Sequence, residues 1–331
     1  PCSREVEATG EAVMQLHKGA WVPPTVCENG DEVMDLLGSR LVYNRQKQYF
    51  SIDQEQAIEK ILTKFQMSDA KGCDNPATSG DISEGTENTV FPLRSCVGAL
   101  SYVASSTRPD IAWSVNKVAR TVSRPTDAAV RAVKRIMKYL VKTKAQKLRW
   151  SPDIEREFNQ TFSAISRAQC FSDSDFAGDH VSLKSTSGVI LYYRGFPCHW
   201  SSKLQTILTH STMEAETTAA CDAIKIIRGQ GWLSWFNDRD FPIIHMDNQS
   251  ALMAAKSATA SKKSKHMMLR IREVSEHTEN LCWCASAKNR ADGLTKKVPT
   301  RTLIQIFGHS DDVAVTGPDL VCAQAVRFVR C

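Results

Sequence analysis

The order of hydrophobic and polar positions between residues 168 and 235 predicts three strands followed by a long helix. Residues 168–173 are largely apolar and end in a polar turn that contains glycine. Residues 187–193 and 196–201 are typical of two strands joined by a turn at Arg194-Gly195, so a hairpin follows the first strand. After Ser211 the apolar positions change to helical spacing. They are Met213, Ala220, Ile224, Ile227 and Trp235.

Shorter elements complete this part of the chain. The pattern predicts a strand at 241–246, a helix at 248–256, a final strand at 280–287 and a last helix at 291–297. A further helix lies before the final strand. The resulting order is three strands, helix, strand, two helices, strand and helix, which predicts an α/β fold.

Upstream of residue 161 the predicted elements are mainly helical. Segments 37–42 and 48–52 indicate a hairpin, and a helix with apolar residues at helical spacing begins near Ile52-Asp53. Two more helices are expected at 92–105 and 109–122, the second with proline in its first turn. Residues 75–88, rich in Gly, Ser, Thr and acids, predict a linker. A second loose stretch is expected at 151–161.

Four acidic residues lie near the starts or ends of predicted elements. Asp173 lies on the first strand, Glu216 in the first turns of the long helix, Asp247 after a later strand and Asp292 at the start of the last helix. Hydrolysis of a phosphodiester needs an activated water and a stabilised leaving oxygen, which two Mg²⁺ ions about 4 Å apart provide. Mg²⁺ prefers oxygen ligands. The four carboxylates therefore predict a two-metal nuclease site with two Mg²⁺ ions, or Mn²⁺, as cofactors.

Neighbouring acids compete for two of these positions. Ser211 and Glu214 fit a capping box, which gives Glu214 a structural role at the start of the helix. Asp175 shares a strand face with Asp173, but Asp173 falls inside the predicted strand. Any single acid near a helix N-terminus is also explained by the helix dipole. Four acids in this order favour the metal site.

Eleven basic residues and a single acid, Asp127, lie between residues 117 and 149. After the Pro125-Thr126 break, apolar residues recur at helical spacing, so one helix face packs while the other presents cations. A solvated basic face is the ordinary explanation of such a run. Its excess of positive charge favours contact with a phosphate backbone. The expected nucleic-acid-binding residues are Lys117, Arg120, Arg131, Lys134, Arg135, Lys138 and Lys142.

Composition is consistent with a globular chain of two domains. The chain has 331 residues, a net charge of +6 and 42% hydrophobic residues. No apolar run approaches the length of a membrane span, and no signal peptide opens the chain, so no membrane partner is expected. The 11 cysteines show no paired CxxC spacing, and we expect reduced thiols in a cytosolic or nuclear protein.

Several phrases occur together and in a fixed order over residues 36–298. They are FPLRSCVGALSYVASSTRPDIAWSVNKVAR, RIMKYLVKTK, SDSDFAGD, KSTSGVILYYRG, WSSKLQTILTHSTMEAE, DNQSAL, SKH and RADGLTKK. In these phrases the chain resembles the C-terminal part of the Pol polyprotein of copia-type LTR retrotransposons. The resemblance implies a reverse-transcriptase thumb and connection region at 33–160 and a ribonuclease H-like domain at 161–300, with a mixed five-stranded sheet and flanking helices. Segments 1–32 and 301–331 remain unassigned.

The resemblance also implies a function. It places catalytic roles on Asp173, Glu216, Asp247 and Asp292, and favours Glu216 over Glu214 because Glu216 opens the Glu-x-x-Ala phrase. The implied reaction is endonucleolytic hydrolysis of the RNA strand of RNA/DNA hybrids, leaving a 3′-hydroxyl and a 5′-phosphate. Expected partners are the hybrid and the remainder of the Pol polyprotein. Expected locations are a cytoplasmic virus-like particle or the nucleus.

The chain departs from the family pattern in two places. No palm aspartates of a polymerase site precede Leu36, so we expect a fragment or a rearranged insertion without polymerase activity. After Ser264-Lys265-His266 the family's acidic and Arg-Tyr-His stretch is replaced by Met267, Met268 and Leu269. Two alternative functions therefore remain: a catalytically inactive nucleic-acid-binding remnant, and a strand-transfer enzyme of the integrase type, which lacks its usual His/Cys zinc module here.

Overall fold

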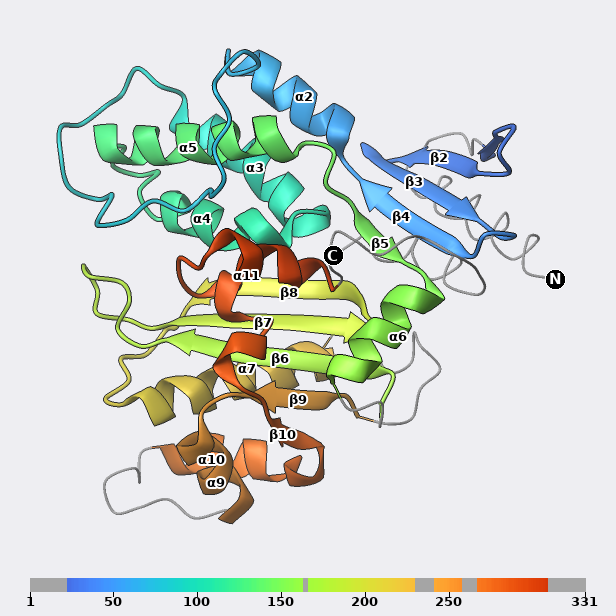
Figure 1. Ribbon diagram of the computed structural model, residues 1–331. Coiled ribbons are helices and arrows are strands. Elements are labelled where there is room, and N and C mark those ends of the chain that lie inside the picture. Colours follow the sequence, from blue (N-terminus) through green and yellow to red (C-terminus); the bar gives the residue numbers. More distant parts are fainter. Residues whose placement is uncertain (1–22, 163–165, 230–240, 258–266, 309–331) are drawn as a thin grey trace.

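The computed structural model describes residues 23–162, 166–229, 241–257 and 267–308. Within these ranges the chain forms two five-stranded sheets and nine α-helices. In Figure 1, a layer of helices lies above the second sheet, and the first sheet lies beside that layer. The predicted α/β class is confirmed.

The first sheet is antiparallel and has the order β1-β2-β3-β4-β5. Its strands are β1 (Thr25–Val26), β2 (Glu32–Leu36), β3 (Ser39–Asn44), β4 (Tyr49–Asp53) and β5 (Leu148–Trp150). The predicted hairpin corresponds to β3 and β4, where Leu41, Tyr43 and Ile52 are buried. Strand β5 was not predicted, because three residues are too few to show alternation. Through β5 the chain returns to this sheet after the helices.

Four helices follow β4 and pack together through a second hydrophobic core that includes Leu100, Val133 and Met137. They are α2 (Glu55–Lys64), α3 (Leu93–Ser106), α4 (Pro109–Ala119) and α5 (Asp127–Thr143). Helix α5 starts where the break predicted it, because the Thr126 hydroxyl accepts a hydrogen bond from the Ala129 N–H at 3.1 Å. Residues 75–88 contain no helix or named strand, as the predicted linker requires.

A fully buried ion pair fixes the junction between α3, α4 and α5. Arg108 and Asp110 have no exposed side-chain surface and form two hydrogen bonds, of 2.9 and 2.6 Å. The Tyr139 hydroxyl donates to Asp110 Oδ2 at 2.8 Å. The Arg108 guanidinium also donates to the carbonyl and the hydroxyl of Thr143 at the end of α5. Every charge in this network therefore has a partner, which is the condition for burying it.

The stretch at 151–161 is a helix, and the prediction of a loose linker was wrong. Helix α6 (Pro152–Thr161) starts after Ser151, whose hydroxyl accepts a hydrogen bond from the Ile154 N–H at 3.3 Å. A serine cap followed by proline is a favourable helix start. The polar composition of the segment concealed this signal. Its buried Phe158 packs against the ring of Tyr192 at 4.8 Å, so α6 joins the second sheet.

The second sheet is mixed and has the order β10-β9-β6-β7-β8. Strands β10, β9 and β6 run parallel, whereas β7 is antiparallel to both β6 and β8. The strands are β6 (Ala168–Asp175), β7 (Thr186–Tyr193), β8 (Phe196–Leu204), β9 (Ile243–Met246) and β10 (Leu281–Trp283). Helix α7 (Thr212–Gly229) covers one face, and α9 (Gln249–Ser257) and α10 (Met268–Ser275) pack beside it (Figure 1). The predicted order of elements is confirmed up to β10.

The last strand and the helix predicted after it are shorter than predicted. Strand β10 ends at Trp283, and the expected helix at 291–297 is a single 3₁₀ turn, η4 (Asp292–Leu294). Gly293 and Pro299 disfavour a longer helix here. Other short elements are η2 (Thr278–Asn280), η3 (Ser286–Lys288), α11 (Thr300–Ile304) and η5 (Gln305–Phe307). Trp235, predicted on the long helix, lies outside the described residues.

The two sheets share one hydrophobic core. The ring of Phe50 on β4 lies 5.2 Å from the ring of Phe196 on β8. The Trp200 indole N–H, also on β8, donates to the carbonyl of Ala104 on α3 at 2.7 Å. The helical layer, the first sheet and the second sheet are therefore packed against one another rather than joined only by the chain.

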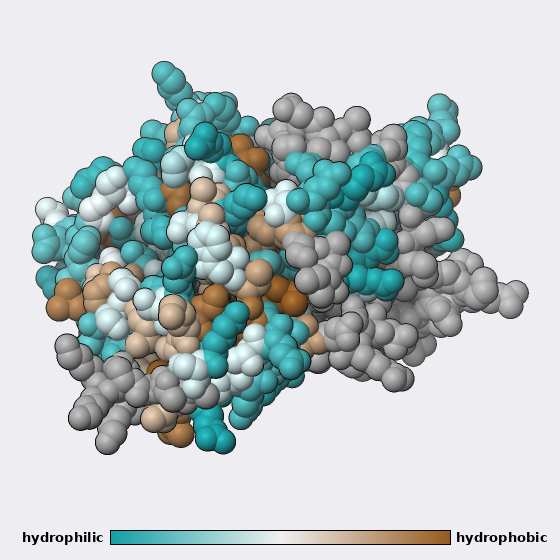
Figure 2. Space-filling view, turned by 60° about the horizontal axis from the view of Figure 1, so that its bottom comes forward, coloured by the Kyte–Doolittle hydropathy of each residue, from teal (hydrophilic) through white to brown (hydrophobic). Residues whose placement is uncertain are grey.

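No helix of the described ranges is long and apolar enough to cross a membrane. On the face shown in Figure 2, hydrophobic residues form small patches among hydrophilic ones.

Removing one partner of the buried ion pair should destabilise the fold. In Asp110→Ala the Arg108 guanidinium stays buried without its counter-ion, and we expect the free energy of unfolding to fall by about 3–5 kcal/mol. Asp74→Ala removes the acid of an exposed ion pair with Lys142 and should change the free energy of unfolding by less than about 1 kcal/mol. Urea unfolding of both variants measures the difference. Equal stability of the two variants would contradict this account.

Candidate functional site

Asp173 lies near the end of β6 and is 2% exposed. Its neighbour across the sheet is Gly188 on β7. A Cβ at residue 188 would lie 2.6 Å from Thr295 Cγ2 and 2.9 Å from the Ala291 carbonyl oxygen. Only glycine allows the turn η4 to approach the sheet this closely. The sequence thereby brings the turn that begins at Asp292 over the strand that carries Asp173.

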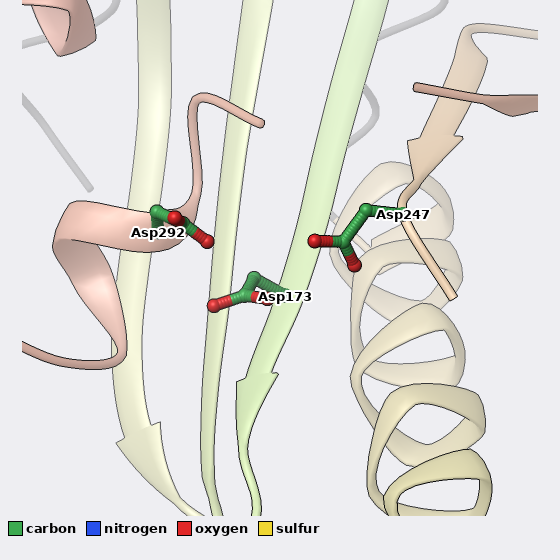
Figure 3. A group of neighbouring side chains, drawn as sticks. All are labelled: Asp173, Asp247 and Asp292. Atoms are coloured by element: carbon green, nitrogen blue, oxygen red, sulfur yellow. The ribbon is translucent and has the colours of Figure 1, made fainter. Parts of the chain in front are cut away.

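Asp247 and Asp292 reach the same place from other elements. Asp247 directly follows β9, which runs parallel to β6, so the ends of the two strands meet at one edge. Asn289 donates to the Ser172 carbonyl at 3.0 Å and accepts a hydrogen bond from the Ala291 N–H, which fixes the segment before Asp292. Figure 3 shows the three aspartates pointing toward one another.

The ligand oxygens of Asp173, Asp247 and Asp292 all lie within 4.8 Å of one another. In the described residues this is the one group of three or more His, Cys, Asp or Glu side chains with such spacing. The donors are all carboxylate oxygens, which suit a hard cation such as Mg²⁺ or Mn²⁺ better than a soft one. The residues present therefore fit a divalent metal site.

Glu216 lies beside this group without belonging to it. Its Oε1 accepts hydrogen bonds from the N–H and the hydroxyl of Ser174, at 3.2 and 2.9 Å. Ser174 follows Asp173 directly, so Glu216 contacts the same strand from α7. Its other oxygen, Oε2, is buried and has no hydrogen-bond partner. The structure thus brings three of the four predicted acids together and places the fourth next to them with one oxygen unused.

The two competing acids lie outside the three-aspartate group, and Glu214 has a capping role. Glu214 accepts a hydrogen bond from the His210 N–H at 2.8 Å, while the Ser211 hydroxyl accepts one from the Glu214 N–H at 3.3 Å. This is the predicted cap, with His210 in place of Ser211 as the donor to Glu214. Asp175 shares the strand face of Asp173, but its carboxylate lies where a side chain at Gly178 would be, outside the three-aspartate group.

Burial and mutual repulsion disfavour negative charge at this site. Burial, followed by the charges of Asp173 and Asp247, raises the pKa of Glu216 to about 9. Burial and the charge of Asp173 raise the pKa of Asp292 to about 6, against the effect of Lys296. Burial also raises the pKa of Asp247, although a hydrogen bond from Ser286 lowers it. Perturbed acids gathered in this way are typical of functional sites.

Two contacts at the site were not anticipated from the sequence. The Lys296 Nζ lies 3.3 Å from Asp173 Oδ2 and 3.0 Å from Asp292 Oδ1. The Thr295 hydroxyl donates to the same Asp173 oxygen. Both residues belong to the phrase RADGLTKK, and Lys296 is four residues after Asp292. That spacing, on the helix predicted at 291–297, was the available signal for an ion pair.

The chain is similar in sequence to proteins of plant transposons. It is 30% identical over 284 residues to the retrovirus-related Pol polyprotein from transposon TNT 1-94 of Nicotiana tabacum, covering 80% of this chain and 20% of that protein. It is 28% identical over 281 residues to the Pol polyprotein from transposon RE1 of Arabidopsis thaliana, covering 81% and 18%. For transposon RE2 of the same plant the identity is 27% over 300 residues, covering 86% and 19%.

The chain is homologous to the retrovirus-related Pol polyproteins of copia-type transposons. No family model matches it. The chain spans about a fifth of the length of these Pol polyproteins. Homology to these Pol polyproteins agrees with the predicted retrotransposon origin.

The basic residues that the sequence predicts to contact nucleic acid divide into two groups. Lys117 is half-buried, lies over the ring of Trp113 and donates to the Gly80 carbonyl at 2.8 Å. Arg120 pairs with Asp179 at 3.1 Å, in the loop between β6 and β7. These two side chains therefore have partners within the chain. The remaining five residues all lie on α5.

The α5 residues form one face of the helix. Arg131, Lys134, Lys138 and Lys142 are exposed, and Arg135 is partly exposed. Their spacing of three or four residues places them together along the helix. The buried face of α5 carries the predicted apolar stripe, including Val133 and Met137. The predicted division into a packed face and a cationic face is thus present, although Lys142 pairs with Asp74.

The raised pKa of Glu216 predicts that the metal-free protein loses stability as pH rises. Between pH 4.5, the ordinary pKa of glutamate, and about pH 9 the folded state keeps a proton on Glu216, whereas the unfolded state releases it. Each unit by which the pH rises in this window therefore lowers the free energy of unfolding. Between pH 7 and 8 in EDTA we expect the free energy of unfolding to fall by about 1 kcal/mol. Glu216→Gln should remove this component.

Glu214→Gln is the matched control, since its side-chain oxygen still accepts from the His210 N–H and the pH dependence should persist. The chosen window also avoids His199 and His245, whose pKa burial lowers to about 4. If urea unfolding gives the same pH dependence for Glu216→Gln and the unmodified protein, the raised pKa of Glu216 is disproved.

Proposed function

We propose that this chain is a metal-dependent endonuclease of the ribonuclease H type that hydrolyses the RNA strand of RNA/DNA hybrids. The observation that carries the proposal is the convergence of Asp173, Asp247 and Asp292 from three separate elements, with the unpartnered oxygen of Glu216 beside them. Buried like charges are costly, and a fold without a use for them would not gather them.

The order of the second sheet supports the ribonuclease H-like assignment. Three consecutive antiparallel strands, β6, β7 and β8, are followed by α7. Strands β9 and β10 come next and run parallel to β6. This arrangement places a central strand and its parallel neighbour with their ends at one edge, where Asp173 and Asp247 lie. The site therefore follows from the sheet topology rather than from a flexible loop.

Each acid has a role in this proposal. Two bound Mg²⁺ ions would supply an activated water and stabilise the charge of the leaving oxygen. Asp173 lies between the other two aspartates in Figure 3 and would help to hold both ions. Glu216 and Asp247 would hold the position beside the leaving group, and Asp292 would help to hold the position that activates water. Because Asp173 is buried, competing water is excluded from its carboxylate oxygens.

Substrate selection would depend on the shape and the hydroxyls of the hybrid. Contacts to 2′-hydroxyls identify the RNA strand, and backbone contacts follow the DNA strand. The exposed basic residues of α5 would contact phosphates and contribute affinity without reading bases. The remainder of a Pol polyprotein would act on the same duplex.

The hydrolase assignment is tested by cleavage of a labelled RNA/DNA hybrid. We expect cleavage in Mg²⁺, none in EDTA, and a loss of about a hundredfold or more in Asp173→Asn and Asp247→Asn, because each removes several kcal/mol of stabilisation from the transition state. Asp222→Asn, a partly exposed acid on α7 outside the group, should cleave normally.

Two further results define the outcome. Glu216→Gln should lose activity, whereas Glu214→Gln should retain it. Cleavage that survives Asp173→Asn and Asp247→Asn together would refute the site. Tight hybrid binding without Mg²⁺-dependent cleavage by the unmodified protein would instead identify a binding remnant, and preference for duplex DNA would indicate strand transfer.

The cationic face of α5 is tested by hybrid binding at several salt concentrations. Replacing Arg131, Lys134 and Lys138 together by glutamine should weaken binding and reduce the salt dependence, by roughly 0.9 in the log–log slope for each phosphate that the variant no longer neutralises. The control variant replaces Lys225 on α7 and Lys256 on α9, two exposed lysines, by glutamine. If the slope of the α5 variant is unchanged, the cationic face of α5 is a solvated surface that does not contact the hybrid.

A further inference from the structure

Lys296 is the positive charge at the candidate metal site. Its ammonium group contacts Asp173 Oδ2 at 3.3 Å and Asp292 Oδ1 at 3.0 Å. It therefore joins two carboxylates that come from β6 and from η4. We propose that Lys296 is an internal counter-ion, which occupies the aspartate group when no divalent cation is bound and is displaced when one binds. This inference rests on the metal site of the proposed function.

The first argument is that Lys296 contacts carboxylate oxygens that the divalent cation would also need. Asp173 Oδ2 and Asp292 Oδ1 belong to two of the three residues that form the candidate metal site, whose ligand oxygens lie within 4.8 Å of one another. An ammonium group and a divalent cation cannot both neutralise the same carboxylates at close range without repelling each other. Binding of the cation therefore requires that Lys296 withdraws.

The second argument is that Lys296 is able to withdraw. Its side chain is 39% exposed, whereas that of Asp173 is 2% exposed and that of Asp292 14%. A lysine stem is long and flexible, so its charged end can move into water at little cost. Thr295, which also donates to Asp173, is fully buried and belongs to the turn that packs against Gly188. Lysine is the movable partner and threonine the fixed one.

The third argument is the energetic need for a cation. Three aspartates lie together in a site largely removed from water, where their repulsion is weakly screened. Lys296 offsets part of that repulsion in the metal-free protein. Removing its charge should consequently have two opposite effects: a less stable metal-free protein, and tighter binding of a divalent cation because the competitor is gone.

The next residue provides a matched control. Lys297 is exposed, and its ammonium group contacts the Ser79 hydroxyl at 2.9 Å rather than an acid of the site. Lys297→Met therefore removes one positive charge at nearly the same position in the chain. Any general effect of net charge will appear in both variants, whereas loss of the counter-ion will appear only in Lys296→Met.

The experiment measures Ca²⁺ binding and metal-free stability of the full chain without any substrate. We expect Lys296→Met to bind Ca²⁺ about tenfold more tightly than the unmodified protein in calorimetric titration, the affinity ratio for about 1.4 kcal/mol. We expect its thermal midpoint in EDTA to fall by several degrees and to recover on addition of Ca²⁺. Lys297→Met should match the unmodified protein in both measurements. Affinity of Lys296→Met that is equal to or weaker than that of the unmodified protein overturns the proposal.

A second measurement needs no variant and covers the case in which Lys296→Met fails to fold. Reductive methylation of the unmodified protein, read by mass spectrometry, reports how accessible each lysine amine is. Saturating Ca²⁺ should increase the labelling rate of Lys296 several-fold and leave Lys297 unchanged. An unchanged or slower rate at Lys296 overturns the exchange.

These outcomes are distinct from those that test the proposed function. A protein that binds Ca²⁺ and releases Lys296 but never cleaves a hybrid would refute the nuclease and preserve the exchange. A protein that cleaves hybrids while Lys296→Met binds cations no more tightly would do the reverse.

Discussion

Repulsion between carboxylates is the constraint on which the second half of the molecule depends. Asp173, Asp247, Asp292 and Glu216 gain nothing from one another, so the surrounding structure must hold them together. It does so with rigid elements. A central strand, the end of its parallel neighbour, a helix and a 3₁₀ turn each supply one acid, and packing behind them resists the repulsion. A divalent cation would convert this unfavourable arrangement into a favourable one.

Much of this arrangement could be predicted from the sequence, because the order of strands and helices determines which strand ends are neighbours. Asp173 and Asp247 follow from that rule. The position of Asp292 depends on Gly188 and Asn289, which admit and anchor η4, and neither residue carries a periodic signal. The capping pattern explained Glu214, whereas the bond of Glu216 to Ser174 is a tertiary contact that no local pattern encodes.

The errors have physical causes of the same kind. Helix α6 was missed because its polar composition outweighed the serine and proline at its start. Strand β5 and the turn η4 are short, and packing across the shared core determines them more than propensity does. The pair between Arg120 and Asp179 is likewise a tertiary contact that the sequence pattern did not predict. It ties the helical layer to the loop after β6, so the two halves of the chain support one site.

A comparison within this chain separates a structural acid from a functional one. Asp110 and Glu216 are both buried, but Asp110 receives two hydrogen bonds from Arg108 and one from Tyr139, so its charge is satisfied inside the protein. Glu216 receives bonds at one oxygen only, and its nearest charges are negative. A buried acid of the first kind stabilises the fold. One of the second kind destabilises the metal-free fold above its ordinary pKa, and a bound divalent cation would offset that cost.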